Sequence, residues 1–191
     1  MNGALQCLVD CEPLTEYFFK SNYKSRLTKS KLLLPEVHLT FAYVNLLIDL
    51  FDPKSSKCPI NPNKFRNSLS QYNPEFSGHA QKYSLEFLST VLSGLHDGLN
   101  EIKEKPYVER DTLFSNSPTQ KDLEDWGRRG WTAHEMRNKS VVVDLFHGML
   151  KSTTICGECA GIEVSFDPFQ EITVPLTGRD WYRPQRPRHS R

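Results

Sequence analysis

Two cysteines separated by two residues, Cys156-Gly-Glu-Cys159, are the clearest candidates for chemistry in this chain. A Cys-x-x-Cys pair on a turn directs two sulfur atoms toward one point, which supplies half of a tetrahedral zinc site. No second pair of this kind follows in the sequence, and no spacing favours any of the other conceivable ligands: Cys7, Cys11, Cys58, His134 and His147. We therefore expect Cys156 and Cys159 to act as metal ligands in a half-site for zinc, with the remaining ligands open.

Redox and nucleophilic catalysis have less support from the residues. A thioredoxin-like pair needs a helix N-terminus to lower the thiol pKa, whereas patterns typical of strands flank this pair on both sides. Cys7 and Cys11 have apolar neighbours, which favours buried, inert thiols. The six histidines are scattered, and none marks a general base, including His96 on the polar side of a leucine seam. The residues alone indicate no active site.

The composition bounds the class of protein. With 191 residues, 38% of them apolar, the chain is long enough for one or two domains with a core. Its formal net charge of +1 gives no general reason to bind nucleic acid or an anionic membrane. No apolar run is long enough to cross a membrane, and no secretory signal pattern opens the chain. Five cysteines, an odd number, fit a reducing compartment, so we expect a soluble protein of the cytoplasm or nucleus.

Most of the chain has patterns typical of helices. The expected helices cover residues 2–20, as two short helices bent near Pro13, and then residues 35–52, 61–72, 84–105 and a short helix or turn near 138–150. The longest leucine seam begins after Ser84, the expected N-cap, and ends before Pro106. Residues 107–121 are polar and predict a surface loop.

The pattern changes to alternation after Lys151. The segments KSTTI, GIEVSF and EITVPL predict three strands, with Ile162, Val164 and Phe166 on one face and the cysteine pair on the turn between the first two strands. Beyond Thr177 the sequence GRDWYRPQRPRHSR contains five arginines and no apolar period, which predicts a disordered tail. The fold class that follows is α+β.

Three blocks of the sequence, in the same order, resemble segments of one known protein family. MNGALQCL with EPLTEYFF is similar to the family segment G-N-T-C-[FY]-M-N-[SA]-x-x-Q-x-L that carries the nucleophile. FSGHAQKYSLEFLSTVLSGLHDGLNEIKEKPY resembles the family's G-Y-Q-Q-Q-D-[SA]-Q-E-[FL]-L stretch and the helix after it. WTAHEMRNKSVVVDLFHGMLKSTTICGEC, followed by FDPF, resembles a block of the large multidomain subgroup. Together these blocks cover about two-thirds of the chain, and the family that they resemble is the ubiquitin-specific protease family of cysteine deubiquitinases.

The resemblance implies a papain-like, right-hand catalytic domain of which this chain is a part. It assigns residues 1–177 to a partial catalytic domain, with a helical thumb at 1–145, the start of the fingers at 146–177 and a basic tail at 178–191. The family hydrolyses the isopeptide bond after the C-terminal glycine of ubiquitin with a cysteine thiolate and a histidine. Ubiquitin or a ubiquitinated protein is therefore the expected partner, and Cys156 and Cys159 match the first ligand pair of the family's zinc ribbon.

Transferring the family's functional residues gives a mixed result. The family nucleophile stands two positions before the Met of M-N and the His box lies in the palm, so neither falls within these residues, and we expect the chain to be inactive alone. Gln81 and Glu86 match residues that contact the ubiquitin tail. Tyr83 and Leu85 replace an Asp and a Gln, which we expect to weaken binding by ~1.5–3 kcal/mol where the lost contact was charged. Gly98 replaces an Asp, at about 1 kcal/mol of helix propensity for an exposed position.

Three hypotheses of function stay open at this point. The first is a deubiquitinase truncated at both ends of its catalytic domain. The second is a non-catalytic module that binds ubiquitin or another protein. The third is a small zinc-dependent interaction protein whose Cys-x-x-Cys pair is completed by a partner. We also expect a chain prone to aggregation, because the thumb helices would lack the palm as a burial partner.

Overall fold

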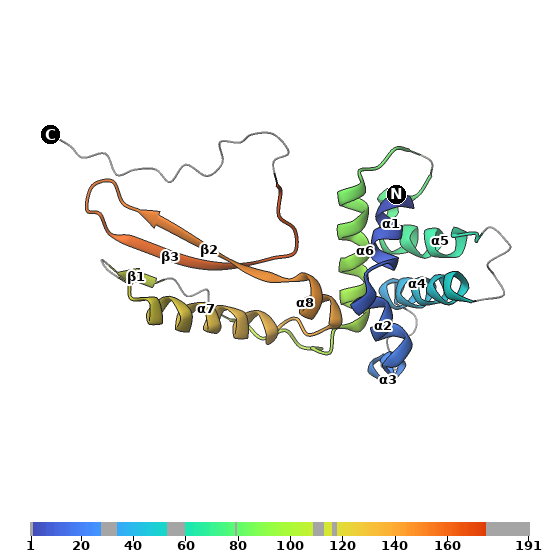
Figure 1. The fold of residues 1–191 in the computed structure, drawn as a ribbon, viewed down its shortest axis with the longest axis horizontal. Helices are drawn as coiled ribbons and strands as arrows, with labels where there is room; N and C mark the ends of the chain where they lie inside the picture. Colours follow the sequence, from blue (N-terminus) through green and yellow to red (C-terminus); the bar gives the residue numbers. More distant parts are fainter. Residues whose placement is uncertain are drawn as a thin grey trace.

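The computed structural model describes residues 2–27, 34–52, 60–78, 80–108, 113–115 and 118–174. Two parts lie side by side in Figure 1. We call the first part the helical body: α1 (Asn2–Val9), α2 (Glu12–Lys20), α3 (Tyr23–Arg26), α4 (Pro35–Phe51), α5 (Asn63–Tyr72), the 3-10 helix η3 (Pro74–Phe76), α6 (Ser84–Leu99) and α8 (Val141–Phe146). The second part, the α7–sheet layer, contains α7 (Gln120–Glu135), β1 (Leu113–Ser115), β2 (Gly148–Ile155) and β3 (Ile162–Phe169). The expected α+β class is confirmed.

A continuous apolar core fills the helical body. Tyr43 of α4 lies at its centre and is fully buried, and its hydroxyl donates a hydrogen bond to the Leu8 carbonyl oxygen at 3.4 Å. Burial raises the pKa of this hydroxyl well above its usual value. Edge-to-face ring contacts join Tyr43 to Phe18 at a centroid distance of 5.6 Å and Phe65 to Phe87 at 6.5 Å. Because such ring pairs stabilise beyond simple area burial, they hold α2, α4, α5 and α6 together.

The predicted helices of this part are confirmed, with differences at their ends. The bend between α1 and α2 occurs at Asp10 and Cys11, and Pro13 falls in the first turn of α2, where its missing N–H costs nothing. Tyr83, not Ser84, is the N-cap of α6, and its side chain makes no capping hydrogen bond.

Gly98 corrects a second expectation, because it is buried where α6 crosses α4. A Cβ added here would collide with Thr40 Oγ1 and would lie 2.9 Å from the Glu36 carbonyl oxygen. Thr40 itself donates to that carbonyl at 2.9 Å. Gly98 therefore permits the close approach of two helices and is not an exposed weak point in α6.

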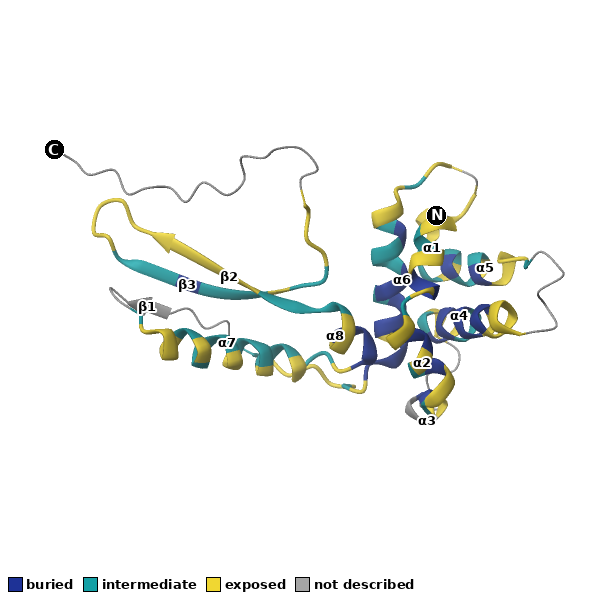
Figure 2. Ribbon diagram, in the orientation of Figure 1, coloured by how far each residue is buried: buried dark blue, intermediate teal, exposed yellow. Residues whose placement is uncertain are grey.

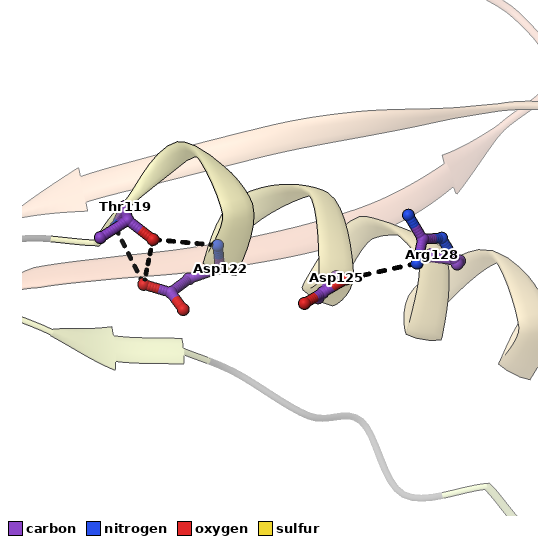
Figure 3. A network of polar contacts seen from close by, with 4 residues as sticks. All are labelled: Thr119, Asp122, Asp125 and Arg128. Carbon is purple, nitrogen blue, oxygen red and sulfur yellow. Dashed lines mark hydrogen bonds and ion pairs between the residues drawn. The ribbon is translucent and has the colours of Figure 1, made fainter.

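Residues 107–121, expected to be a loop, contain β1 and the first residues of α7 in their described parts. A capping box begins α7: the Thr119 hydroxyl accepts from the Asp122 N–H at 3.2 Å, and the Asp122 carboxylate accepts from the Thr119 N–H at 3.0 Å (Figure 3). An ion pair between Asp125 and Arg128 follows at 3.3 Å. No residue of α7 is fully buried, so the helix depends strongly on these local interactions.

The three strands form an antiparallel sheet in the order β1-β3-β2. Of the expected apolar face of β3, only Val164 is fully buried, while Ile162 and Phe166 are half-buried. Small residues of α7 allow the sheet to approach, since a Cβ at Gly127 would lie 3.1 Å from the Phe166 ring. The predicted third strand, EITVPL, is wrong for its described part, because residues 171–174 take no strand structure. The predicted tail at 178–191 lies outside the described residues.

The short helix α8 joins the two parts. Ser140 is its N-cap and accepts a hydrogen bond from the Val143 N–H at 3.4 Å, while Val141 and Val142 belong to the core of the helical body. β2 begins directly after the C-cap residue, His147. Among the residues that the structure describes, no helix has the length and apolar character needed to span a membrane.

Candidate functional site

The segment before α6 carries the residues that were matched to ubiquitin-tail contacts. Gln81 lies in an extended, exposed stretch, and Glu86 lies half-buried in the first turn of α6, where a negative charge is favourable. The Arg66 guanidinium donates to the Gly78 carbonyl oxygen, and the Lys82 ammonium lies 5.7 Å from the centroid of the Phe76 ring. These contacts anchor both sides of the segment before α6, in which Ala80, Gln81 and Tyr83 are exposed.

The same segment presents apolar side chains where the family motif has polar ones. Tyr83 is 82% exposed and Leu85 is 57% exposed, so neither contributes to the core. Phe87, in contrast, is buried against Phe65 and Phe76. The described geometry is therefore an exposed surface on a rigid base, with Gln81, Tyr83, Leu85 and Glu86 accessible to a peptide.

The Cys156-Gly-Glu-Cys159 turn lies at the far end of the β2–β3 hairpin, which confirms its predicted position between two strands. The turn is tight: the Cys156 N–H donates to the Gly161 carbonyl at 2.9 Å, and the Ala160 N–H donates to the Cys156 carbonyl at 3.0 Å. Ala160 has a φ of 54°, in the left-handed region where glycine is usual. This closed turn holds both cysteines exposed at one point of the surface.

The hydrogen bonds inside the turn favour a thiolate. The backbone N–H groups of Cys159 and Glu158 and the Cys159 thiol lower the pKa of the Cys156 thiol below its usual value. Because zinc binds thiolates, this donor set fits two of the four positions of a tetrahedral zinc site. In the described part of the chain no group of three or more His, Cys, Asp or Glu residues could hold a metal ion. The residues present therefore fit a half-site.

The other cysteines differ from their expected environments. Cys7 is exposed on α1, and Cys11 is half-buried at the N-cap of α2, so the two do not share a single helix. Cys58 lies outside the described residues. The expectation of a buried, inert thiol at Cys7 was wrong, because its face of α1 is turned away from the core.

Three histidines that the sequence left scattered are brought together at the end of α6. His96 is buried, although its spacing placed it on the polar side of the leucine seam, and His134 and His147 lie close to it. Asn138 and Ser140 complete the cluster. The three histidines come from separate elements, so their spacing in the sequence did not predict the cluster. The one signal in the sequence was that each histidine lies within a block that resembles the family.

Comparison with known proteins identifies the family of the chain. The sequence pattern described as ubiquitin carboxyl-terminal hydrolase matches residues 1–174. The chain belongs to the ubiquitin carboxyl-terminal hydrolase family, which confirms the resemblance to ubiquitin-specific proteases.

Individual relatives support the same assignment. Ubiquitin carboxyl-terminal hydrolase 4 of Mus musculus is 38% identical over 176 residues, which cover 92% of this chain and 18% of the relative. Ubiquitin carboxyl-terminal hydrolase 15 of Homo sapiens is 38% identical over 92% of this chain and 17% of its own length. The chain thus spans under a fifth of the length of these relatives.

Proposed function

We propose that this chain forms the thumb and the first finger strands of a cysteine deubiquitinase that hydrolyses the isopeptide bond after the C-terminal glycine of ubiquitin. The observation that carries the proposal is the 38% identity to ubiquitin carboxyl-terminal hydrolases over 92% of the chain. In this proposal the 191 residues bind ubiquitin but do not supply the nucleophile or its base, so the chain is inactive alone. It acts in the cytoplasm or nucleus and does not use nucleic acid or membranes as partners.

The proposed contact with ubiquitin is the exposed segment before α6, where Gln81 and Glu86 receive the extended, basic tail. Glu86 offers a carboxylate and Gln81 an amide, and both accept hydrogen bonds from a peptide. Tyr83 offers only one hydroxyl in place of the family's carboxylate. We therefore expect the chain to bind ubiquitin weakly.

Titration of the 191-residue chain with ubiquitin tests this contact. Tyr83→Asp restores a carboxylate and is expected to raise the affinity by about tenfold or more, because a charged hydrogen bond contributes ~1.5–3 kcal/mol. Tyr107→Asp is the matched control, since Tyr107 is an exposed tyrosine (89%) away from the segment, and it should leave the affinity unchanged. Equal affinities for the two variants would refute the contact, and labelling of the chain by ubiquitin vinyl sulfone would refute its inactivity.

A non-catalytic module that binds ubiquitin or another protein is the second candidate function. The exposed segment on its rigid base supports binding equally well in this case, whether or not a longer chain is catalytic. This candidate would be favoured over the first if a longer form of the protein, with residues before Met1 and after Arg191, bound ubiquitin but was not labelled by ubiquitin vinyl sulfone.

We also propose that Cys156 and Cys159 hold zinc as two of its four ligands. Their thiolate-stabilising turn supports this assignment. When bound, the metal would fix the end of the β2–β3 hairpin, and the missing ligands would come from another part of the protein or from a partner. The third hypothesis, a zinc-dependent interaction protein, uses the same two cysteines, with the missing zinc ligands supplied by a partner.

Metal analysis tests the half-site directly. Zinc added to the purified chain is expected to bind through the two thiolates, and Cys156→Ser is expected to lose most of this zinc, because a hydroxyl is a poor zinc ligand at neutral pH. Cys7→Ser is the control, since Cys7 is exposed on α1 and distant from the turn. The cobalt(II) absorption of each protein would report the number of thiolate ligands. Zinc content equal in the two variants would contradict the assignment.

A further inference from the structure

Five side chains form one continuous hydrogen-bonded chain at the joint between the helical body and the α7–sheet layer. His96 lies in the last turn of α6, His134 in the last turn of α7, and His147 caps α8 directly before β2. The links between them are 2.8 Å for Ser140–His96, 3.3 Å for His96–Asn138, 3.3 Å for Asn138–His134 and 3.0 Å for His134–His147. We call this set the imidazole chain.

Asn138 fixes the direction of every hydrogen bond in the imidazole chain. Its amide nitrogen lies 3.2 Å from the His134 carbonyl oxygen, which can only accept, so the orientation of the amide is determined. The same nitrogen lies 3.3 Å from His134 Nδ1, which must therefore be an acceptor. The amide oxygen faces His96 Nε2, which must therefore carry a hydrogen.

The remaining protons follow from these two assignments. His134 carries its hydrogen on Nε2 and donates it to His147 Nδ1. Burial lowers the pKa of His96 and favours its neutral form, so with a hydrogen on Nε2 its Nδ1 accepts from the Ser140 hydroxyl, which in turn caps α8. Each imidazole in the chain is thus neutral and has its hydrogen on Nε2.

A second proton on either outer histidine creates a conflict between donors. On His147 it would place Nδ1–H against the Nε2–H of His134. On His134 it would place Nδ1–H against the Asn138 amide nitrogen, and rotating that amide would place its oxygen against the His134 carbonyl oxygen, two acceptors facing each other. His96 is more tolerant, because the Ser140 hydroxyl can rotate to accept. His134 and His147 are therefore the positions at which acid opposes the closed arrangement.

Charged groups around the imidazole chain change how strongly acid opposes the closed arrangement, but they do not reverse the direction of this effect. Burial lowers the pKa of His96, His134 and His147, and the other two imidazoles help to lower the pKa of His147 to about 4. The charged groups that face the imidazoles are Asp97 and Glu135, which favour protonation, and Lys105, which opposes it. The ion pair of Glu101 with Lys139, at 3.3 Å, and exposed Asp144 complete the charges on the adjoining elements.

We propose that the imidazole chain is a pH-sensitive latch, closed when its three histidines are neutral and opened by acid, that holds the end of α7 and the start of the hairpin against α6. The closed state binds fewer protons than an open state whose histidines titrate at their usual value of 6.5. Closing is therefore fully favourable above about pH 6.5 and weakens as the pH falls toward about 4. This property is independent of ubiquitin or zinc binding.

Two measurements on the 191-residue chain test the latch. Nitrogen-15 correlation spectra of the histidines at pH 7.5 should show three neutral rings with hydrogen on Nε2, and the rings of His134 and His147 should take up protons only at a pH below their usual pKa of 6.5. Amide exchange, expressed as protection relative to the intrinsic rate at each pH, should fall by about tenfold or more for residues 134–147 between pH 7.5 and pH 5, while α4 keeps its protection. Ordinary titration near pH 6.5, or equal loss of protection in α4, would overturn the proposal.

Matched variants separate the latch from general acid effects. His147→Gln keeps a side-chain oxygen that can accept from His134 but cannot be protonated, so the fall in protection should become smaller. His38→Gln alters an exposed histidine of α4 outside the chain and should leave the fall unchanged. The same fall in both variants would refute the proposal. The ring spectra of the unmodified chain decide the question if His147→Gln does not fold.

Discussion

The helical body and the α7–sheet layer are stabilised in different ways. The 22 buried side chains of the main core all come from the helical body or its connecting residues, whereas β2, β3 and α7 contain one fully buried apolar residue, Val164. Figure 2 shows the contrast, with buried segments concentrated around α4 and α6 and exposed or intermediate segments along the hairpin and α7. Since apolar burial is the main favourable term in folding, the helical body should be the stable unit.

The α7–sheet layer has little apolar burial and is stabilised by local interactions and by its contact with α6. Its helix begins with a capping box, its three strands pair in one antiparallel sheet, and the imidazole chain joins the end of α7 and the start of β2 to α6. Regions of this kind open at a lower free energy than a packed core. The layer is therefore expected to exchange its amide hydrogens faster than α4 and α6.

The largest effect should come from the centre of the helical body. Leu95 of α6 is fully buried, and Leu95→Ala is expected to lower the free energy of unfolding by ~2–5 kcal/mol through lost burial and a cavity. Val164→Ala, at the one buried apolar position of the β2–β3 hairpin, should cost about 1.6 kcal/mol, from two methyl-sized groups at ~0.8 kcal/mol each. Urea unfolding followed by circular dichroism measures both. A larger cost for Val164→Ala would break the proposed contrast between the two parts.

A smaller loss is expected where α6 crosses α4. Gly98→Ala forces a methyl group against Thr40 and the Glu36 carbonyl and should destabilise the chain by ~1–3 kcal/mol. Gly3→Ala is the matched control: Gly3 lies in α1 with no atom close to an added Cβ, so helix propensity should make this change neutral or stabilising by up to about 1 kcal/mol. Thermal melts of the two variants should therefore shift in opposite directions or differ clearly in size. Equal shifts would mean that α4 and α6 have room to separate.

Features of the fold that depend on residues close together in the sequence could be predicted, whereas features that depend on contacts between distant elements could not. The helices α4 and α6 were predicted because a buried helix face repeats every three to four residues in the sequence itself. The turn at Cys156 and Cys159 was predicted because the strands on both sides are adjacent in sequence. The helix α7 was not among the predicted helices, since it has no buried apolar stripe and its capping box lies in polar residues.

Features that depend on meetings between distant elements could not be predicted in this way. Gly98 looked like a loss of helix propensity, because the approach of α4 is visible only in three dimensions. The histidines looked unrelated, because His96 is separated by 38 residues from His134 and reaches it only through Asn138. Ile172 and Val174 alternate as in a strand, but they are exposed and take no strand structure. The exposed tail-binding segment was assigned through the family resemblance and not through its spacing.

The smallest effect should be confined to α7. Thr119→Ala removes the hydroxyl that caps the helix and should cost about 1 kcal/mol of local stability, seen as faster amide exchange in the first turn of α7 with no change in α4. The hydrogen bonds from Thr119 also lower the pKa of the Asp122 carboxyl, so its contribution is present above its ordinary value of 3.8 and is lost as the pH falls below that value. Acid should therefore loosen the first turn of α7 at a lower pH than it opens the imidazole chain at the other end. Simultaneous loosening of both ends would mean that α7 responds to acid as one unit, and the layer would then be more cooperative than its burial implies.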